Sequence, residues 1–397
     1  MLLKNKKILI GITGSIAAYK AIILVRLLIK SGAQIKVVMT PSAIDFVSPL
    51  VLSVLSKNKV YIQWQEQNEW NNHVELGRWA DVFIIAPLSC NTLSKMANGG
   101  CDNLFLAVYL SATCPVVVAP AMDEEMWHHP STKRNIDQLI VYGNKIIEVQ
   151  DGELASGIIG QGRMTEPEDI IIYLEENYFR ENTLAGKKVL VSAGPTYERI
   201  DPVRFIGNRS SGKMGFAVAE AFYMKGAEVV LVSGPTNVST RFKGIEIKKI
   251  ENANEMFNTC LQYGNSDIIV MSAAVADFTP IDVADQKIKK TGETLQLNLI
   301  KTKDILKRFG AEKKTNQFIA GFALETENEM ANAVKKLHEK NLDCIILNSM
   351  NDAGAGFEKD TNKISIINKN ETISFEVKSK KEVAIDIVKY ITERVIK

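Results

Sequence analysis

Short apolar segments rich in valine and isoleucine recur along the chain, each followed by a turn of small residues and a longer amphipathic stretch. Because strands that alternate with helix-length segments form βαβ units, this pattern predicts an α/β fold with parallel sheets. In the first half the predicted strands are Ile8–Ile12, Ile35–Met39, Val82–Ala86, Val116–Ala119 and Ile146–Val149. In the second half they are Val189–Val191, Val229–Val232, Ile268–Met271, Phe318–Ala320, Cys344–Leu347 and Ile364–Ile367. The last of these strands is predicted to form a hairpin with residues 373–377, and a final helix is predicted at 382–396.

The two halves of the chain begin alike. Lys6–Ile10 reads KKILI before a Gly/Thr/Ser turn, and Lys187–Val191 reads KKVLV before Ser-Ala-Gly-Pro-Thr. Each segment has the character of the first strand of a doubly wound sheet. We therefore predict two doubly wound α/β domains, residues 1–185 and 186–397, joined without a long linker.

Composition and charge narrow the class of protein. The 397 residues are 46% hydrophobic and 24% charged with a net charge of +2, which argues against disorder and against a nucleic-acid-binding arm. The five cysteines form no CxxC pair, so a zinc site or disulfide framework is not expected and a reducing cytosol is the predicted compartment. Residues 103–122 carry no charge, but Pro115 and Pro120 favour a buried helix followed by a strand over a membrane span.

Two turns of the first half follow predicted strands. Gly11–Ala18 opens a helix, and glycine there lets the backbone approach a phosphate; a tight turn without a ligand is the less favoured alternative. Its spacing differs from the GxGxxG dinucleotide fingerprint. Ser89, Asn91 and Thr92 begin another helix, where such residues either cap the helix or bind a ligand.

Three further features of the first half are candidates for chemistry. His73 is either structural or a proton shuttle. Asp123 follows the strand that ends at Pro120, and it is also a candidate helix cap. The glycine-rich segment Glu153–Met164 is long enough to act as a lid, or is a plain surface loop.

The densest signature of the second half is Ser192–Phe216. Within it, Gly207–Lys213 reads GNRSSGK and matches the first part of a Walker A loop, but Met214 replaces the Ser or Thr that would hold Mg²⁺. A P-loop is therefore not favoured. Further along, small residues at 272–276 allow a ligand close to the backbone, and the lysine run 287–290 is either a solvated face or a phosphate contact.

These motifs together resemble known families. The order GxTGSIAAYK, APxSxNTxxKxAxGxxDNL, PAMxxxMW and GRM in the first half is similar to the flavin-dependent cysteine decarboxylases. The second half resembles phosphopantothenate–cysteine ligases, so that the chain from about residue 5 to 395 resembles the bifunctional bacterial enzymes of coenzyme A biosynthesis. The resemblance implies an N-terminal flavodoxin-like FMN domain and a C-terminal Rossmann-like ligase domain.

The implied reactions are consecutive. The ligase half would activate 4'-phosphopantothenate with CTP and Mg²⁺ as an acyl-cytidylate and join it to cysteine. The decarboxylase half would then use FMN to convert the product to 4'-phosphopantetheine. His73, Asp123 and Ser156 would be catalytic residues of the first half, and the implied flavin-binding positions are Gly14, Ser15, Ile16, Thr40, Ser42, Ser89, Asn91 and Thr92.

In the second half the resemblance places Asn208 on the acyl-cytidylate and Lys287 at the charged transition state. Arg204 would hold phosphopantothenate. The implied CTP contacts are Met271, Ser272, Ala273, Asp277, Lys303, Asp304, Ile305, Leu306, Phe322, Lys336 and Lys340, and the metal ligands are unassigned.

Two positions depart from the family pattern. Asp123 replaces the asparagine of PxMNxxMW, and an ionised carboxylate accepts hydrogen bonds but cannot donate them. Ser156 replaces a lid cysteine that serves as proton donor, and an alcohol is a far weaker acid than a thiol. Our hypothesis is an active decarboxylase with a rearranged proton donor.

Several alternatives stay open at this point. A nicotinamide dehydrogenase on twin Rossmann domains lacks its GxGxxG, and a flavin- or nucleotide-sensing module would not need Asn208 and Lys287. No membrane or nucleic-acid partner is expected. The resemblance also implies a homo-oligomer with dimeric ligase contacts and trimeric decarboxylase contacts, which twelve subunits would satisfy.

Overall fold

The chain folds into two compact units, Met1–Phe179 and Arg180–Lys397. The computed structural model describes residues 3–66, 69–289, 294–325, 327–349 and 359–396. Residues just after the division belong to the second unit, because the backbone N–H of Leu184 donates to Lys225 O at 2.8 Å and Arg180 Nε donates to Tyr223 O at 2.9 Å.

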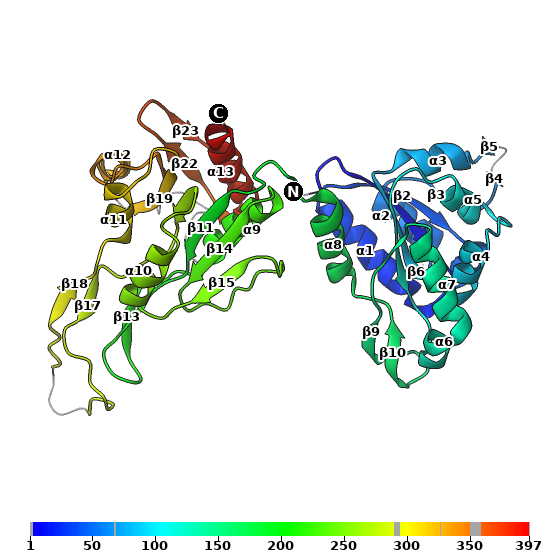
Figure 1. The fold of residues 1–397 in the computed structure, drawn as a ribbon, viewed down its shortest axis with the longest axis horizontal. Coiled ribbons are helices and arrows are strands. Elements are labelled where there is room, and N and C mark those ends of the chain that lie inside the picture. The colour runs from blue at the N-terminus through cyan, green and yellow to red at the C-terminus, as the bar shows by residue number, and fades with distance from the viewer. Residues whose placement is uncertain (1–2, 67–68, 290–293, 326, 350–358, 397) are drawn as a thin grey trace. The chain divides into compact units, whose positions relative to one another are not determined.

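The first unit is built on a six-stranded parallel sheet in the order β3-β2-β1-β6-β7-β8. The chain leaves β1 toward one edge and returns to fill the other, so the order reverses between β1 and β6 (Figure 1). In such sheets ligands bind outside the carboxyl ends of the strands at this reversal. The strands are β1 (Lys7–Ile12), β2 (Gln34–Met39), β3 (Val60–Tyr61), β6 (Val82–Leu88), β7 (Val116–Pro120) and β8 (Lys145–Ile146).

Helices cover both faces of this sheet. Alternation within β1 sends Ile8 and Ile10 to one core and Leu9 to the other. The first core lies under α1 (Tyr19–Lys30), α2 (Pro49–Ser56) and α8 (Pro167–Leu174). The second lies under α3 (His73–Trp79), α4 (Cys90–Ala97), α5 (Leu104–Leu110) and α7 (Pro130–Val141). The remaining elements are η1 (Ile16–Ala18), η2 (Pro41–Asp45), α6 (Glu124–His128), η3 (Glu175–Phe179) and the hairpins β4 (Gln65–Glu66)/β5 (Glu69–Trp70) and β9 (Gln150–Glu153)/β10 (Ile159–Arg163).

The second unit repeats this topology. Its eight-stranded sheet runs β15-β14-β11-β16-β19-β20-β22-β23, with the order reversing between β11 and β16. Strands from β15 to β20 are parallel, whereas β22 and β23 are added antiparallel. The strands are β11 (Lys188–Ala193), β14 (Glu228–Ser233), β15 (Glu246–Lys249), β16 (Ile268–Met271), β19 (Phe318–Glu325), β20 (Cys344–Ser349), β22 (Ile364–Ile367) and β23 (Thr372–Ser374).

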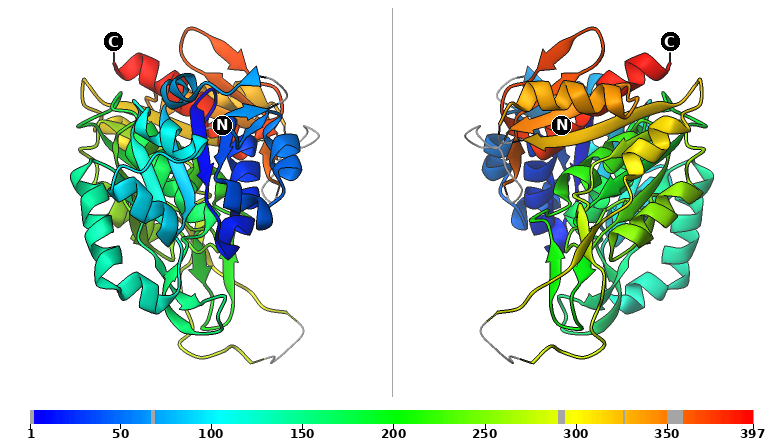
Figure 2. Two further views of the ribbon diagram at one scale, coloured as in Figure 1. Left: turned by 90° about the vertical axis from the view of Figure 1, so that its right-hand side faces the viewer. Right: turned by 90° about the vertical axis from the view of Figure 1, so that its left-hand side faces the viewer.

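Helices and three small strand pairs complete the second unit. Helices α10 (Ala253–Gln262), α11 (Ile305–Ala311) and α12 (Glu329–Glu339) share one core, and α9 (Lys213–Met224) packs with α13 (Lys380–Val395). The strand pairs are β12 (Tyr197–Arg199)/β13 (Phe205–Gly207), β17 (Phe278–Pro280)/β18 (Leu299–Lys301) and β21 (Thr361–Asn362)/β24 (Lys378–Ser379). After β17, residues 281–289 extend away from the sheet (Figures 1 and 2).

The predicted fold class of two doubly wound α/β domains is confirmed. The uncharged stretch 103–122 forms the buried helix α5 and the strand β7, as expected from Pro115. Among the described residues, no helix is both long enough and apolar enough to cross a membrane. All five cysteines are free.

Candidate functional sites

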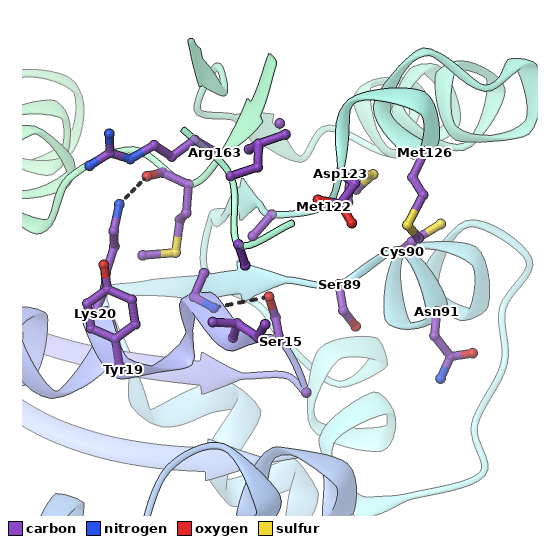
Figure 3. A pocket seen from close by; sticks show the side chains of 18 of the residues that line it. Ser15, Tyr19, Lys20, Ser89, Cys90, Asn91, Met122, Asp123, Met126 and Arg163 are labelled. Carbon is purple, nitrogen blue, oxygen red and sulfur yellow. Dashed lines mark hydrogen bonds between the residues drawn. The ribbon is translucent and has the colours of Figure 1, made fainter. Parts of the chain in front are cut away.

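A pocket of about 760 Å³ lies at the order reversal of the first sheet (Figure 3). Its walls come from the turns after β1, β6 and β7 and from the hairpin β9–β10. This size is typical of a small-molecule site. Of the residues predicted from the sequence, the pocket is lined by Gly14, Ser15, Ile16, Ser42, Ser89, Asn91 and Asp123.

The turn after β1 brings glycine and hydroxyl groups together. Ser15 is the N-cap of η1, where its Oγ accepts a hydrogen bond from Ala17 N at 3.3 Å. A Cβ on Gly14 would lie 2.7 Å from Ser42 Oγ, so only glycine allows this close approach. Thr40 is buried behind them, with its Oγ1 3.2 Å from Ser42 Oγ. Thr40 therefore reaches the pocket only through Ser42.

The turn after β6 is held by Thr13. Its Oγ1 donates to Pro87 O at 2.8 Å and accepts from Ser89 N at 2.8 Å. Ser89 is the N-cap of α4, and its Oγ donates to Thr92 Oγ1 at 3.3 Å. Thr92 is buried, so of the three polar residues predicted here Ser89 and Asn91 line the pocket and Thr92 supports them.

The glycine-rich segment for which a lid was one interpretation contains the hairpin β9–β10, which borders the pocket and is called the lid hairpin below. Met122 N donates to Gly162 O at 3.1 Å, which docks β10 onto the turn after β7. At the tip, Ser156 Oγ donates to Asp123 Oδ1 at 2.9 Å. Asp123 occupies the N-cap position of α6, but its side chain makes no capping hydrogen bond. Its carboxylate faces the lid, so the capping interpretation of Asp123 is not supported.

The base of the lid is fixed by a buried lysine. Lys20 Nζ donates to Met164 O and to Glu166 Oε1, both at 2.8 Å, and Arg163 Nη2 donates to the same carboxylate at 2.5 Å (Figure 3 draws Lys20 and Arg163). The hydrogen bond from Lys20 lowers the pKa of Glu166 below its ordinary value despite partial desolvation. This carboxylate therefore stays ionised and bridges two cations.

His73 does not line this pocket. It is the first residue of α3 and lies edge-on to Trp64 and Trp70, with ring centroids 5.7 and 6.4 Å away. Its Nδ1 is buried, and the described residues offer it no hydrogen-bond partner. Within one copy of the first unit, His73 and the pocket are therefore separate.

In the second unit a buried carboxylate organises the predicted site. Asp201 accepts hydrogen bonds from the backbone N–H groups of Val203 and Arg204, both at 2.8 Å, and of Ile288 at 3.2 Å. Arg204 Nε donates to Asp201 at 2.9 Å, and its Nη2 donates to Ile288 O at 2.6 Å. Burial by itself would raise the pKa of Asp201, but these donors lower it to about 2. Arg204 thus fixes the segment that carries Lys287.

Asn208 lies directly after β13. Its amide nitrogen donates to Ala274 O at 3.1 Å and Val275 O at 3.2 Å. The predicted residues Ser272 and Ala273 are held from the opposite side, because their N–H groups donate to Ser192 Oγ at 3.1 and 3.0 Å. Met271 is the last residue of β16, and the segment from Ser272 to Asp277 follows it at the order reversal of the second sheet.

Three of the charged residues predicted to contact CTP are held in ion pairs. Lys340 pairs with Asp304 and Lys336 with Glu325, both at 2.8 Å, so each of the two lysines has its own carboxylate. Although partial burial opposes it, the hydrogen bond from Lys340 lowers the pKa of Asp304. Lys303 lines a second pocket of about 440 Å³, together with Asn254 and Thr302. Ile305 is buried, whereas Leu306 and Phe322 are half-buried.

Lys287 is exposed, and Lys290 lies outside the described residues. Within the described part of the chain, no group of three or more His, Cys, Asp or Glu side chains forms a metal site.

Sequence reasoning missed several residues of the first pocket. Lys20, Tyr19 and Cys90 line it. Cys90 and Tyr19 stand inside motifs already recognised, so their position in the chain was the available signal. Lys20 would ordinarily be expected in solvent, because lysine is rarely buried unless it is paired.

Comparisons with known proteins agree with the two-part organisation. Residues 2–178 match the Flavoprotein family, and residues 184–395 match the DNA/pantothenate metabolism flavoprotein C-terminal domain. The coenzyme A biosynthesis bifunctional protein CoaBC of Bacillus subtilis is 44% identical over 397 residues, covering 98% of this chain and 97% of the relative. This chain belongs to the CoaBC family of bifunctional coenzyme A biosynthesis enzymes. It combines a flavoprotein decarboxylase domain with a ligase domain.

Two further relatives are informative. CoaBC of Haemophilus influenzae is 42% identical over 397 residues, and the match covers 99% of both chains. A protein named cysteine/cysteine sulfinic acid decarboxylase, from an unknown prokaryotic organism, is 48% identical over 353 residues, covering 87% of this chain and 98% of that protein.

Proposed function

We propose that the second unit joins 4'-phosphopantothenate to cysteine with CTP and that the first unit decarboxylates the product with FMN. The observation that carries this proposal is the match of the whole chain to CoaBC proteins, with the first pocket at the order reversal of the flavoprotein domain.

The first pocket suits FMN. Two turns present backbone and hydroxyl groups at the starts of η1 and α4, where the positive end of the helix dipole favours a phosphate. Apolar side chains of Ile16, Met122 and Met164 offer surface for a flat ring. We assign the contacts to Gly14, Ser15, Ile16, Ser42, Ser89 and Asn91, with Thr40 and Thr92 acting through their neighbours. When bound, FMN supplies reversible two-electron oxidation of the cysteine moiety, which makes loss of CO₂ feasible.

The protein's own contribution in this unit is positioning and proton handling. The lid hairpin, docked through Met122 and Gly162, covers one side of the pocket. Asp123 and Ser156 lie where the lid meets the turn after β7. Because His73 does not line the pocket of its own copy, we propose that it completes the site of a neighbouring copy.

In the ligase unit, we assign Lys287 to the charge that develops when the phosphopantothenate carboxylate attacks CTP. Asp201 and Arg204 hold the backbone beside this lysine, so the ammonium group is delivered from a fixed segment. The side-chain amide of Asn208 is assigned to the acyl-cytidylate, and Arg204 to phosphopantothenate, toward which its remaining nitrogen is available.

The nucleotide is assigned to the loops after β16 and β19 and to the start of α11. Lys336 and Lys340 would exchange their carboxylate partners for phosphate oxygens, which leaves Glu325 and Asp304 close to the triphosphate. Mg²⁺ is proposed to arrive with CTP and to be held mainly by phosphate oxygens, which suits its preference for oxygen ligands and retained water.

Oligomeric contacts are proposed for both units. Exposed apolar residues of the second unit gather on β12–β13 and β17–β18, whose strands contact each other: Val203, Phe205, Phe278, Ile281, Val283, Leu299 and Ile300. A second copy of the ligase unit is the proposed occupant. In the first unit, Phe46, Leu50 and Val54 are exposed on η2 and α2 and are assigned to the trimeric contact. The cytoplasm is the proposed compartment, because all five cysteines are free.

A second candidate is decarboxylation of free cysteine or cysteine sulfinic acid, as in the name of the 48% identical relative. The aspartate at position 123 favours it, because a carboxylate can pair with the α-ammonium group of a free amino acid.

The decisive experiment uses the purified full-length protein. We expect pyrophosphate release that requires phosphopantothenate and cysteine and is faster with CTP than with ATP. We also expect CO₂ release from phosphopantothenoylcysteine that exceeds release from cysteine or cysteine sulfinate. Release from the free amino acids alone would favour the second candidate, and absence of both activities would refute the proposal.

A further inference from the structure

The two positions that depart from the family pattern contact each other directly. Ser156 lies at the tip of the lid and Asp123 before α6, and their side chains form a hydrogen bond of 2.9 Å across 33 residues of sequence. Asp123 lines the pocket, and Ser156 follows Ala155, which also lines it. The two replacements therefore share one place in the structure.

The carboxylate of Asp123 is available for this contact because it performs no other described role. It occupies an N-cap position without capping the helix. The backbone near it is fixed by the hydrogen bond between Met122 N and Gly162 O at 3.1 Å, and a Cβ on Gly162 would lie only 2.1 Å from Met122 O. The lid is thus docked tightly beside the pair.

The decarboxylase reaction needs a proton at this place. The carboxylate leaves as CO₂, and the same carbon must gain one proton from the protein or solvent. A serine hydroxyl alone is a poor acid, whereas a carboxylic acid behind it can supply the proton that the hydroxyl gives away.

We propose that Ser156 and Asp123 form a proton-delivering pair, in which Ser156 is the catalytic donor and Asp123 a positioning residue that reprotonates it. This inference rests on the proposed decarboxylase function. The reacting state has a proton on the Asp123 carboxyl group, and the hydrogen bond then runs from Asp123 to Ser156 Oγ, the reverse of its direction in the structure described above. Ser156 Oγ gives its own proton to the substrate carbon while it takes the proton of Asp123, so no alkoxide forms. The carboxylate then regains a proton from water, and one proton is consumed for each CO₂ released.

The substitution D123N separates proton supply from positioning. An asparagine side chain can still accept the hydrogen bond from Ser156 through its carbonyl oxygen, but it has no acidic proton to return. We expect D123N and S156A each to lower 4'-phosphopantetheine formation by about 10²-fold, within the usual contribution of a general acid. The double variant D123N/S156A should be no slower than S156A, because residues that act as one unit are not additive.

The sharpest test is whether D123N changes the rate of product formation in opposite directions in the S156C variant and in the protein that keeps Ser156. In the S156C variant the new thiol is itself an acid, and the adjacent Asp123 carboxylate disfavours loss of its proton as thiolate and competes for its hydrogen bond. D123N should therefore accelerate S156C while it slows the protein that keeps Ser156. We expect D123N/S156C to recover product formation to within about tenfold of the unsubstituted protein.

Flavin absorbance and S131A provide the controls. Ser131 is hydrogen-bonded to His129 at the start of α7 and does not line the pocket, so S131A should retain both product formation and bound flavin. All variants should bind FMN in the same ratio as the unsubstituted protein, because neither side chain is assigned to the flavin. Product isolated from D₂O should carry deuterium on the carbon that lost CO₂, and its formation should show a solvent isotope effect that D123N alters.

Different outcomes identify different failures. No CO₂ release by the unsubstituted, flavin-loaded protein would refute the decarboxylase function itself. An active protein in which D123N has no effect, or has the same effect with Ser156 and with S156C, would overturn the proton-delivering pair alone.

Discussion

The two units share a strand order but finish their binding sites differently. In the first, hydroxyl residues at helix starts and a docked hairpin line a pocket of about 760 Å³. In the second, Asp201 holds the loop of Arg204 and the segment of Lys287, and Lys336 and Lys340 are paired with carboxylates. The comparison teaches that the doubly wound sheet supplies only a place for ligands, and that the segments after its strands decide the chemistry.

The difference between the two sites matches the difference between the two reactions. An oxidative decarboxylation needs a flat cofactor kept from water, which favours an enclosed pocket. A nucleotide-dependent ligation must admit a polyanion and release pyrophosphate, which favours exposed cations that can change partners. Paired lysines suit this role, because their carboxylate partners keep them in place until phosphate arrives.

The largest expected effect is the loss of the ligase activity of the second unit when Lys287 is replaced. K287A should lower CTP-dependent pyrophosphate release by about 10²- to 10³-fold, the usual loss when one group that stabilises transition-state charge is removed. The adjacent exposed lysine provides the matched control K289A, which should stay within about threefold. The measurement is initial pyrophosphate release with saturating substrates. Equal losses in K287A and K289A would show that the lysine segment contributes only general positive charge.

The next largest effect is expected on decarboxylation, when the hairpin that borders the pocket of the first unit is displaced. Gly162 has φ +131° and no room for a Cβ beside Met122 O, so G162A should displace the lid and lower product formation by roughly 10²-fold. G157A is the matched control, because Gly157 also has a positive φ of 82° but open space around its Cβ. Decarboxylation assays of both variants, with pyrophosphate release as an internal reference, check this. If G157A were the slower variant, backbone strain rather than lid docking would explain the loss.

These sites could be predicted from the sequence only in part. Apolar periodicity located the strands, since Ile268–Met271 and Ile364–Ile367 have the predicted bounds, and motif order located the two turns after β1 and β6. Periodicity does not report contacts between distant segments, so it missed the buried lysine Lys20 and the Ser156–Asp123 bond. The resemblance gave His73 as a catalytic residue, and the sequence could not show that the fold sets it against Trp64 and Trp70, outside the pocket of its own copy.

A smaller effect is expected at the base of the lid. K20M removes two hydrogen bonds of a buried ammonium group and should destabilise the lid by about 1.5–3 kcal/mol, the range for hydrogen bonds to charged groups. FMN affinity should fall about tenfold, as measured by quenching of flavin fluorescence. K95M is the control, since Lys95 forms an exposed pair with Asp102, and such pairs contribute little. Unchanged affinity in K20M would show that the lid base is not coupled to the flavin.

The smallest effect concerns assembly of the second unit. V203S/I281S removes two exposed apolar side chains from the proposed contact and should weaken self-association about tenfold. V141S alters an even more exposed valine on α7 of the first unit, outside the two proposed contacts, and should leave assembly unchanged. Mass photometry over a dilution series measures both. An unchanged distribution in V203S/I281S would place the ligase contact elsewhere.

The central claim is that one chain carries two chemically independent sites. Its most direct test uses the same preparations of the full-length protein, K287A and S156A, and measures two activities: CTP-dependent pyrophosphate release, and 4'-phosphopantetheine formation from added phosphopantothenoylcysteine. The account predicts both activities in the unsubstituted protein, loss of only the first in K287A and loss of only the second in S156A. Parallel loss of both activities in either variant would contradict it.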